Sequence, residues 1–117
     1  MAHSAQAIAN YFLNKEVPIT MLQLQRLLLI SQGFYLATHD VPLFEEKVSE
    51  TKGFISSIWN EFKFLADSPI PIGSHSFVYI PGDGLVIPEV RAEEALKILG
   101  KVWEIYGNLP LETLHNV

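Results

Sequence analysis

The stretch that decides the fold is ITMLQLQRLLLISQGFYLATHDVPLF, residues 19–44. Thr20 is a preferred residue for the start of a helix, and Gln23 stands three positions later, so the two can form a capping box. From Leu22 to about Thr38 the leucines and aromatic residues fall on two sides of the expected helix. A helix that is apolar on two sides is covered by other elements on both. The sequence therefore predicts a central, buried core helix.

A shorter helix is expected on the N-terminal side of the central one. Ser4 is a good N-cap residue. The apolar residues that follow it at helical spacing are Ala7, Ile8, Tyr11 and Phe12. Pro18 ends this helix, because the residue before a proline avoids the helical conformation. The central helix is interrupted at residues 40–42, and residues 43–52 are expected to form a loop that can hold a short extended segment.

The second half of the chain adds further helices and a hairpin. Residues 55–65 have the apolar spacing of a helix, whereas residues 68–73 contain two prolines that exclude one. Two segments rich in β-branched and aromatic residues, 76–80 and 85–87, follow next. They flank the sequence Pro-Gly-Asp-Gly at residues 81–84, and this pattern predicts a β-hairpin.

The last strong helical pattern spans residue 89 to about residue 106. Pro88 precedes it and suits the first turn of a helix, and Gly107 is a typical helix stop. Residues 110–115 are expected to form a short final helix. The sequence thus predicts a mainly α fold: one compact domain, residues 1–117, in which helices bundle around the central buried helix, with one small β-hairpin. A chain of 117 residues is typical of a single domain.

Composition and charge narrow the classes of function. The chain has 8 basic and 13 acidic residues, a formal net charge of −5, and no cysteine. A nucleic-acid-binding protein usually has a basic stripe, so nucleic acid is disfavoured, whereas an acidic surface suits a basic protein partner. The start lacks the basic and apolar regions of a secretory signal, and the longest apolar run, residues 27–30, is too short to span a membrane. We therefore expect a cytoplasmic protein without membrane contact.

The residues that could carry catalysis are scattered along the chain. No two of the four histidines have the i, i+4 spacing of a helical metal pair. The adjacent glutamates at 45–46 and at 93–94 do not share a helix face, so neither pair is a natural acid–base couple. The Gly-Asp-Gly sequence at 82–84 fits a turn better than an anion-binding loop. We therefore expect no enzymatic activity, no metal and no cofactor.

Most aromatic residues are expected in the core, because aromatic residues at helical spacing usually pack inward. Phe62 and Phe64 cannot face the same way on one helix, so one of them, or Phe44, is a candidate for an exposed apolar patch. The loop of residues 40–53 and the start of the third helix are expected to bind a protein partner, since binding residues gather on loops held by a rigid scaffold. The candidate partner-binding residues are Arg26, Phe44, Glu45, Glu46, Trp59 and Glu61.

Two alternatives remain open for these residues. Phe44 either anchors a partner, with the two glutamates beside it meeting basic groups, or packs into the core while the glutamates only solvate the loop. The polar residues of the central helix are Gln25, Arg26 and Gln32. They either bond to neighbouring backbone groups or, for Arg26, face a groove that binds the partner.

Six segments, taken in order, carry a resemblance to a known family. They are Ala9-Asn-Tyr-Phe-Leu13, Ile19-Thr-Met-Leu-Gln-Leu-Gln-Arg-Leu-Leu-Leu29, Ser31-Gln-Gly-Phe-Tyr-Leu-Ala37, Pro42-Leu-Phe-Glu45, Asn60-Glu-Phe-Lys63 and Val102-Trp-Glu-Ile-Tyr-Gly107. These segments resemble the SocA-like antitoxin family, phage-associated proteins also called the Panacea domain. The chain departs from the family pattern at Arg26, where the family has lysine, and at residues 52–55, where it has an aromatic residue followed by Gly-Pro-Val.

The resemblance implies an α-rich domain that neutralises a cognate protein toxin by binding it directly. Some members of the family also hand the toxin to a protease. The expected function is therefore that of the antitoxin of a toxin–antitoxin system, with a basic toxin as partner and, for an adaptor, a protease as well. The alternatives are a small hydrolase or transferase with an unrecognised site, and a nucleic-acid-binding regulator, against which the acidic balance weighs.

Overall fold

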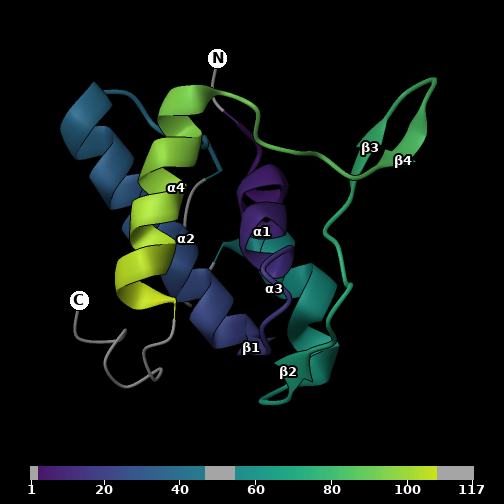
Figure 1. Cartoon of the computed structure of the whole chain (residues 1–117). Coiled ribbons are helices and arrows are strands. Elements are labelled where there is room, and N and C mark those ends of the chain that lie inside the picture. Colours follow the sequence, from purple (N-terminus) through teal and green to yellow (C-terminus); the bar gives the residue numbers. More distant parts are fainter. Residues whose placement is uncertain (1–2, 47–54, 108–117) are drawn as a thin grey trace.

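The computed structural model describes residues 3–46 and 55–107, and these ranges hold four α-helices, one 3-10 helix and four short strands (Figure 1). In chain order the elements are α1 (Ala5–Leu13), β1 (Ile19–Thr20), α2 (Met21–His39), α3 (Ser56–Phe62), the 3-10 helix η1 (Lys63–Leu65), β2 (Pro69–Ile70), β3 (Val78–Ile80), β4 (Gly84–Val86) and α4 (Glu93–Tyr106). The strands pair as two antiparallel two-stranded sheets, β1 with β2 and β3 with β4. The fold is mainly helical, as predicted, and the β1–β2 sheet is added to the one hairpin that the sequence predicts.

The first two helices begin where the sequence places them. The Ser4 hydroxyl accepts a hydrogen bond from the Ala7 amide at 3.1 Å. At the start of α2 the Thr20 hydroxyl accepts from the Gln23 amide at 3.2 Å, and the Gln23 side chain accepts from the Thr20 amide at 2.7 Å. This reciprocal pair is the predicted capping box, and it satisfies two of the backbone donors that a helix start leaves unpaired.

The core lies between the four helices, and α2 contacts the other three as well as β1 (Figure 1). The largest fully buried apolar side chains are Ile8, Phe12, Leu24, Leu27, Leu28, Leu43, Phe44, Ile55, Ile58 and Leu99. Full burial of one such side chain stabilises the fold by about 1.5–3 kcal/mol relative to exposure. Leu24, Leu27 and Leu28 of α2 belong to this set, so the prediction that α2 is a core helix is confirmed for this part of the helix.

The burial of α2 stops before its C-terminal end, which corrects the expectation of a helix covered on two sides along its whole length. Its last buried residue is Ser31, and Phe34 is 41% exposed. With 19 residues α2 is roughly 28 Å long, whereas α1 has 9 residues and α4 has 14. The shorter helices leave the end of α2 partly open, where Thr38 and His39 line a pocket together with Glu94, Lys97, Ile98 and Lys101 of α4. The Phe34 ring contacts Tyr106 of α4, with 6.3 Å between the ring centroids.

Two glutamine side chains of α2 fasten the segments around it. Gln25 Nε2 donates to the Ile55 carbonyl at 3.1 Å, and Gln25 Oε1 accepts from the Ile55 amide at 2.8 Å. Gln32 Oε1 accepts from the Leu43 and Phe44 amides at 2.7 and 3.2 Å, and its Nε2 donates to the Phe44 carbonyl at 2.7 Å. Both glutamines thus bond to backbone, which is one of the two alternatives from the sequence. They supply partners to backbone groups that have no helix or strand to pair with.

The third and fourth helices differ from the predicted ranges in detail. The predicted helix at 55–65 is divided between α3 and η1. α4 begins at Glu93 and not directly after Pro88. The Pro88 carbonyl accepts a hydrogen bond from the Asn10 side chain at 2.9 Å, so this stretch is held against α1 before the helix starts. The predicted final helix at 110–115 lies outside the described residues.

Candidate functional site

The β3–β4 hairpin stands apart from the helices (Figure 1) and exposes large apolar side chains. Tyr79 pairs with Leu85 across the two strands, and the two residues are 69% and 71% exposed. Phe77 and Ile87, each one position outside a strand end, fall on the same face because side chains alternate along extended chain. Both are 43% exposed. These four residues are named the hairpin face.

The turn of the hairpin has the geometry that its sequence predicts. The Asp83 amide donates to the Ile80 carbonyl at 2.9 Å. Pro81 occupies the second position and Gly82, with φ of 93°, the third, which is the pattern of a type II turn. Gly84 also has a positive φ, 78°. The prediction of a hairpin turn at this place is confirmed.

Two polar side chains hold the base of the hairpin to the helices. Asn10 in α1 is buried and donates from Nδ2 to the carbonyls of Ser76 and Pro88, both at 2.9 Å, while its Oδ1 accepts from the Ser76 amide at 2.7 Å. Ser76 precedes β3 and Pro88 follows β4, so one side chain joins both ends of the hairpin to α1. Glu61 in α3 accepts from the Ser76 hydroxyl and, at 3.0 Å, from the Phe77 amide. The hairpin therefore projects from a fixed base.

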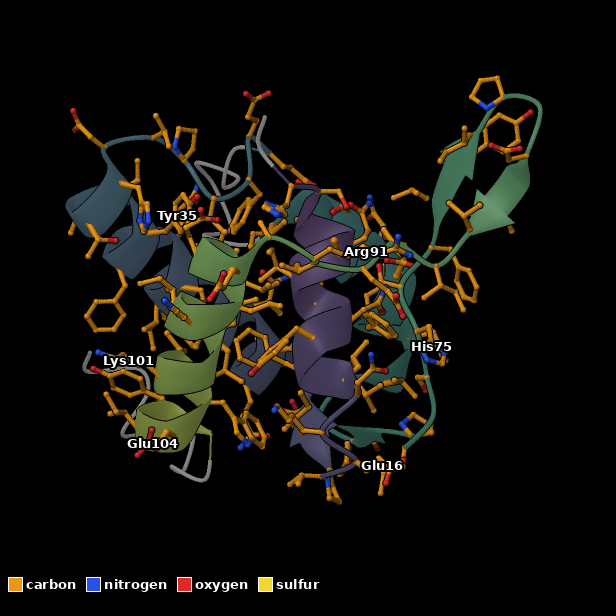
Figure 2. All side chains as sticks on the ribbon, turned by 45° about the horizontal axis from the view of Figure 1, so that its top comes forward. Glu16, Tyr35, His75, Arg91, Lys101 and Glu104 are labelled. Carbon is orange, nitrogen blue, oxygen red and sulfur yellow. The ribbon has the colours of Figure 1, made fainter. Side chains whose placement is uncertain are left out.

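A groove of about 420 Å³ lies at the foot of the hairpin face. Its lining residues are Glu61, Phe62, Phe64, Gly73, Ser74, His75 and Phe77. Phe64 is 78% exposed while Phe62 is buried, which confirms that these two side chains face different ways. Figure 2 shows His75 on the segment that leads up to the hairpin. Because Phe77 belongs to both features, the hairpin face and Phe64 are treated together and named the hairpin surface.

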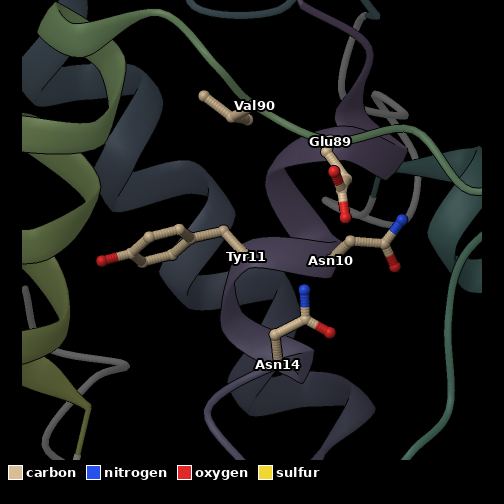
Figure 3. Close-up of a pocket in the computed structure, with 5 residues that line it drawn as sticks. All are labelled: Asn10, Tyr11, Asn14, Glu89 and Val90. Carbon is tan, nitrogen blue, oxygen red and sulfur yellow. The ribbon is translucent and has the colours of Figure 1, made fainter.

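A smaller and more polar cavity of about 190 Å³ lies next to Asn10 (Figure 3). Its lining residues are Asn10, Tyr11, Asn14, Glu89 and Val90. Asn10 and Tyr11 come from α1, Asn14 is the C-cap residue of α1, and the other two come from the segment that leads to α4 (Figure 3). A water molecule takes up about 30 Å³ in the liquid, so this cavity admits water beside the base of the hairpin.

In the described part of the predicted binding loop, Phe44 and Glu46 make contacts within the fold. Phe44 is 1% exposed, so it packs in the core and is not an exposed anchor. The physical reason is the Gln32 side chain, which holds the Phe44 backbone against α2. Glu46 accepts hydrogen bonds from the Ser57 amide and hydroxyl at 2.7 and 2.5 Å and thereby caps the start of α3. Glu45 is exposed, and residues 47–54 lie outside the described residues.

The other three predicted partner-binding residues lie on α2 and α3. Arg26 and Trp59 are half-buried on these helices. Glu61 lines the groove, so among the six predicted residues it is the one that borders the hairpin surface. Sequence reasoning that places aromatic residues in the core misses Tyr79. A signal for its exposure is that residues 77–80, Phe-Val-Tyr-Ile, are apolar on both faces of a hairpin that can turn only one face to the helices.

The described histidines and carboxylates do not gather into a metal-binding group. Across residues 3–46 and 55–107, no three of the His, Asp and Glu side chains are grouped so that they could hold a metal ion. His39 stacks on Tyr35 with 4.3 Å between ring centroids, and burial lowers the pKa of His3 below its ordinary value. In the same ranges, no helix combines the length and apolar character that crossing a membrane requires. The expected lack of an enzymatic activity, a metal and a cofactor stays a prediction.

Comparisons with known proteins do not place the chain in a family. No family model matches it, and neither a curated protein nor a solved structure does. The candidate site is defined by its geometry. It consists of an apolar hairpin on a fixed base, with an apolar groove at its foot, and such a surface is suited to binding another protein.

Proposed function

We propose that this chain is the antitoxin of a toxin–antitoxin system and that it neutralises its toxin in the cytoplasm by direct protein–protein binding. The observation that carries the proposal is the hairpin surface. Its four face residues, with the exposures given above, present roughly 400 Å² of apolar area, taking about 200 Å² for a large side chain. This is about the size of the largest apolar patch on a typical monomer, and such a patch is often functional.

The resemblance to SocA-like antitoxins supports the same function. Its segments include Gln25 and Gln32, whose side chains fasten other segments to α2. These two shared residues therefore belong to the helical scaffold, while residues 76–88 lie between the fifth and sixth segments. On this proposal the scaffold is that of the family, and the hairpin surface meets the toxin.

Charge supports a basic toxin. The chain has a formal net charge of −5, and opposite charges on two partners raise the rate at which they meet. The apolar residues of the hairpin surface would supply most of the affinity, because a few large, buried anchors usually dominate an interface.

The test uses the products of the two genes next to the one that encodes this chain. Each product is expressed alone and together with the chain, both from unrelated inducible promoters, and growth and co-purification are measured. We expect one product to arrest growth, the chain to restore growth, and the two proteins to purify as a stable complex. If neither product is toxic and neither binds the chain, the proposal fails.

The same assay, repeated with the toxic gene under its native promoter and in protease-deficient cells, separates the alternatives. Rescue without a stable complex would favour a small enzyme that modifies the toxin. Rescue only when the toxin is expressed from its native promoter would favour a nucleic-acid-binding regulator. Loss of the toxin that requires a host protease, seen by immunoblot in protease-deficient and parent cells, would assign the adaptor role.

A further inference from the structure

We infer that the β3–β4 hairpin inserts into a cleft of its protein partner, so that both of its faces become buried and Asp83 at its tip meets a cationic group. This inference rests on the proposed function and adds to it the shape and the charge of the partner. It replaces the loop at residues 40–53 as the expected binding element.

The hairpin is apolar on both faces. Tyr79 and Leu85 lie on one face, and Ile80, which is 41% exposed, lies on the other by the alternation of the strand. A hairpin of two strands is marginally stable in water unless something packs on it. Docking of the hairpin on a flat surface would cover one face and leave Ile80 in water, whereas a cleft covers both.

The size of the hairpin face excludes a second copy of the chain as the occupant. Two hairpin faces of roughly 400 Å² each would bury roughly 800 Å², which is below the ~1,200 Å² of a specific interface. Each copy would also bring a net charge of −5 and one Asp83 to the contact. A cleft that surrounds the hairpin covers its edges, its tip and its second face as well, and so reaches the required area with one partner molecule.

The charge at the tip of the hairpin points to a cationic group in the cleft. Asp83 is the one charged residue in residues 76–88, and it is exposed at the turn. A carboxylate that enters a cleft must be paired, because a buried charge without a partner is strongly unfavourable. The cleft is therefore expected to be apolar on its walls and to have lysine or arginine at its base, in agreement with a basic partner.

The test exploits the absence of cysteine from the chain. Tyr79→Cys and Ile80→Cys each place one thiol on one face of the hairpin, and Val41→Cys places a control thiol at an exposed site in the loop after α2. The probe is the toxic neighbouring gene product, purified and added in excess. We expect both hairpin thiols to react with a maleimide at least about tenfold more slowly in the complex, because a specific interface excludes solvent from its core. The Val41→Cys thiol should react at an unchanged rate.

A binding measurement accompanies the labelling. Tyr79→Ser combined with Leu85→Ser is expected to raise the Kd roughly 30-fold or more, the effect of losing interface anchors. Ile105→Ser, which changes an exposed apolar residue of α4, is the matched control and should bind as the wild type does. Asp83→Asn should lower the association rate most clearly at low salt. Circular dichroism of every variant verifies that it is folded.

The outcomes separate this inference from the proposed function. If the complex forms and only the Tyr79→Cys thiol is protected, or neither is, the antitoxin function stands and insertion is overturned. If no neighbouring product binds or arrests growth, the proposed function fails and the inference fails with it. Protection that rises with the concentration of the chain alone, or that phosphatidylcholine vesicles produce, would assign the hairpin to a second copy or to a membrane and would overturn the cleft.

Discussion

Asn10 is the residue at which the fold and the candidate site can be tested together. Asn10→Ala removes the side chain that joins both ends of the hairpin to α1. It leaves the Ser76 amide, the Ser76 carbonyl and the Pro88 carbonyl without their side-chain partner. Ser76 is fully buried, whereas Pro88 is half-buried, so the two Ser76 groups determine most of the effect.

The size of the effect follows from these three groups. A buried backbone group left without a hydrogen bond costs about 1–3 kcal/mol. Water can enter from the cavity of about 190 Å³ beside Asn10 and bond to some of the freed groups, which reduces the loss. We therefore expect the free energy of unfolding to fall by about 2–3 kcal/mol, and the Tm to fall by roughly 8–15 °C for a chain of this size.

Urea denaturation and a thermal melt measure this change, with Asn60→Ala as the matched control. Asn60 is exposed on α3, and its truncation should alter stability by less than about 0.5 kcal/mol. Hydrogen exchange then tests the mechanism, since the amides of β3 and β4 should exchange faster in Asn10→Ala by more than those of α2. A loss of stability no greater than that of Asn60→Ala, or unchanged exchange in the hairpin, would refute the view that Asn10 fixes its base.

Three further predictions concern the core, a helix cap and a histidine. Leu28→Ala should lower the free energy of unfolding by about 2–5 kcal/mol, because Leu28 is fully buried in α2; an unchanged urea midpoint would contradict a core position. Glu46→Lys should lower it by about 1–2 kcal/mol, since it removes the cap on Ser57 and places positive charge at a helix start. The control, Glu45→Lys, should change the free energy of unfolding by less than about 0.5 kcal/mol. Equal losses for Glu45→Lys and Glu46→Lys would exclude the role of Glu46 as a cap of α3. For His3, burial lowers the pKa in the folded state, so the unfolded chain binds the proton more readily. The contribution of His3 to stability is complete above the unfolded pKa of about 6.5 and falls as the pH drops below that value. His3→Asn should therefore reduce the difference between the urea midpoints measured at about pH 7.5 and at about pH 5.5.

Local signals in the sequence predict the starts of α1 and α2 and the hairpin turn. Each depends on residues within a few positions of one another: the Ser4 cap, the Thr20–Gln23 pair, and the glycines at 82 and 84 that supply the positive φ angles. Such features form in the same way wherever the segment lies in the fold. They are therefore readable from one sequence.

The features that the sequence does not predict depend on contacts between distant residues. The start of α4 is displaced because Asn10 in α1 bonds to the Pro88 carbonyl, and nothing near Pro88 in the sequence announces this. Phe44 is turned inward by Gln32, although a phenylalanine beside two glutamates in a loop fits an exposed anchor equally well. The exposure of Tyr79 follows from the hairpin standing away from the helices, which its alternation alone does not reveal.

The separation of scaffold from hairpin has a consequence for partner specificity. Gln25 and Gln32 are constrained by bonds to backbone, so substitutions there lose stability. The hairpin is constrained differently, at its base through Asn10 and in its turn through the two glycines. The two most exposed residues of the hairpin face, Tyr79 and Leu85, are 69% and 71% exposed, so exchanging either for another apolar residue should leave stability nearly unchanged. A protein built in this way can acquire a new partner by changing the hairpin face while its helical core keeps the same residues. If the proposed function holds, the hairpin face, and not the segments that carry the family resemblance, is the part of the chain that determines which protein it binds.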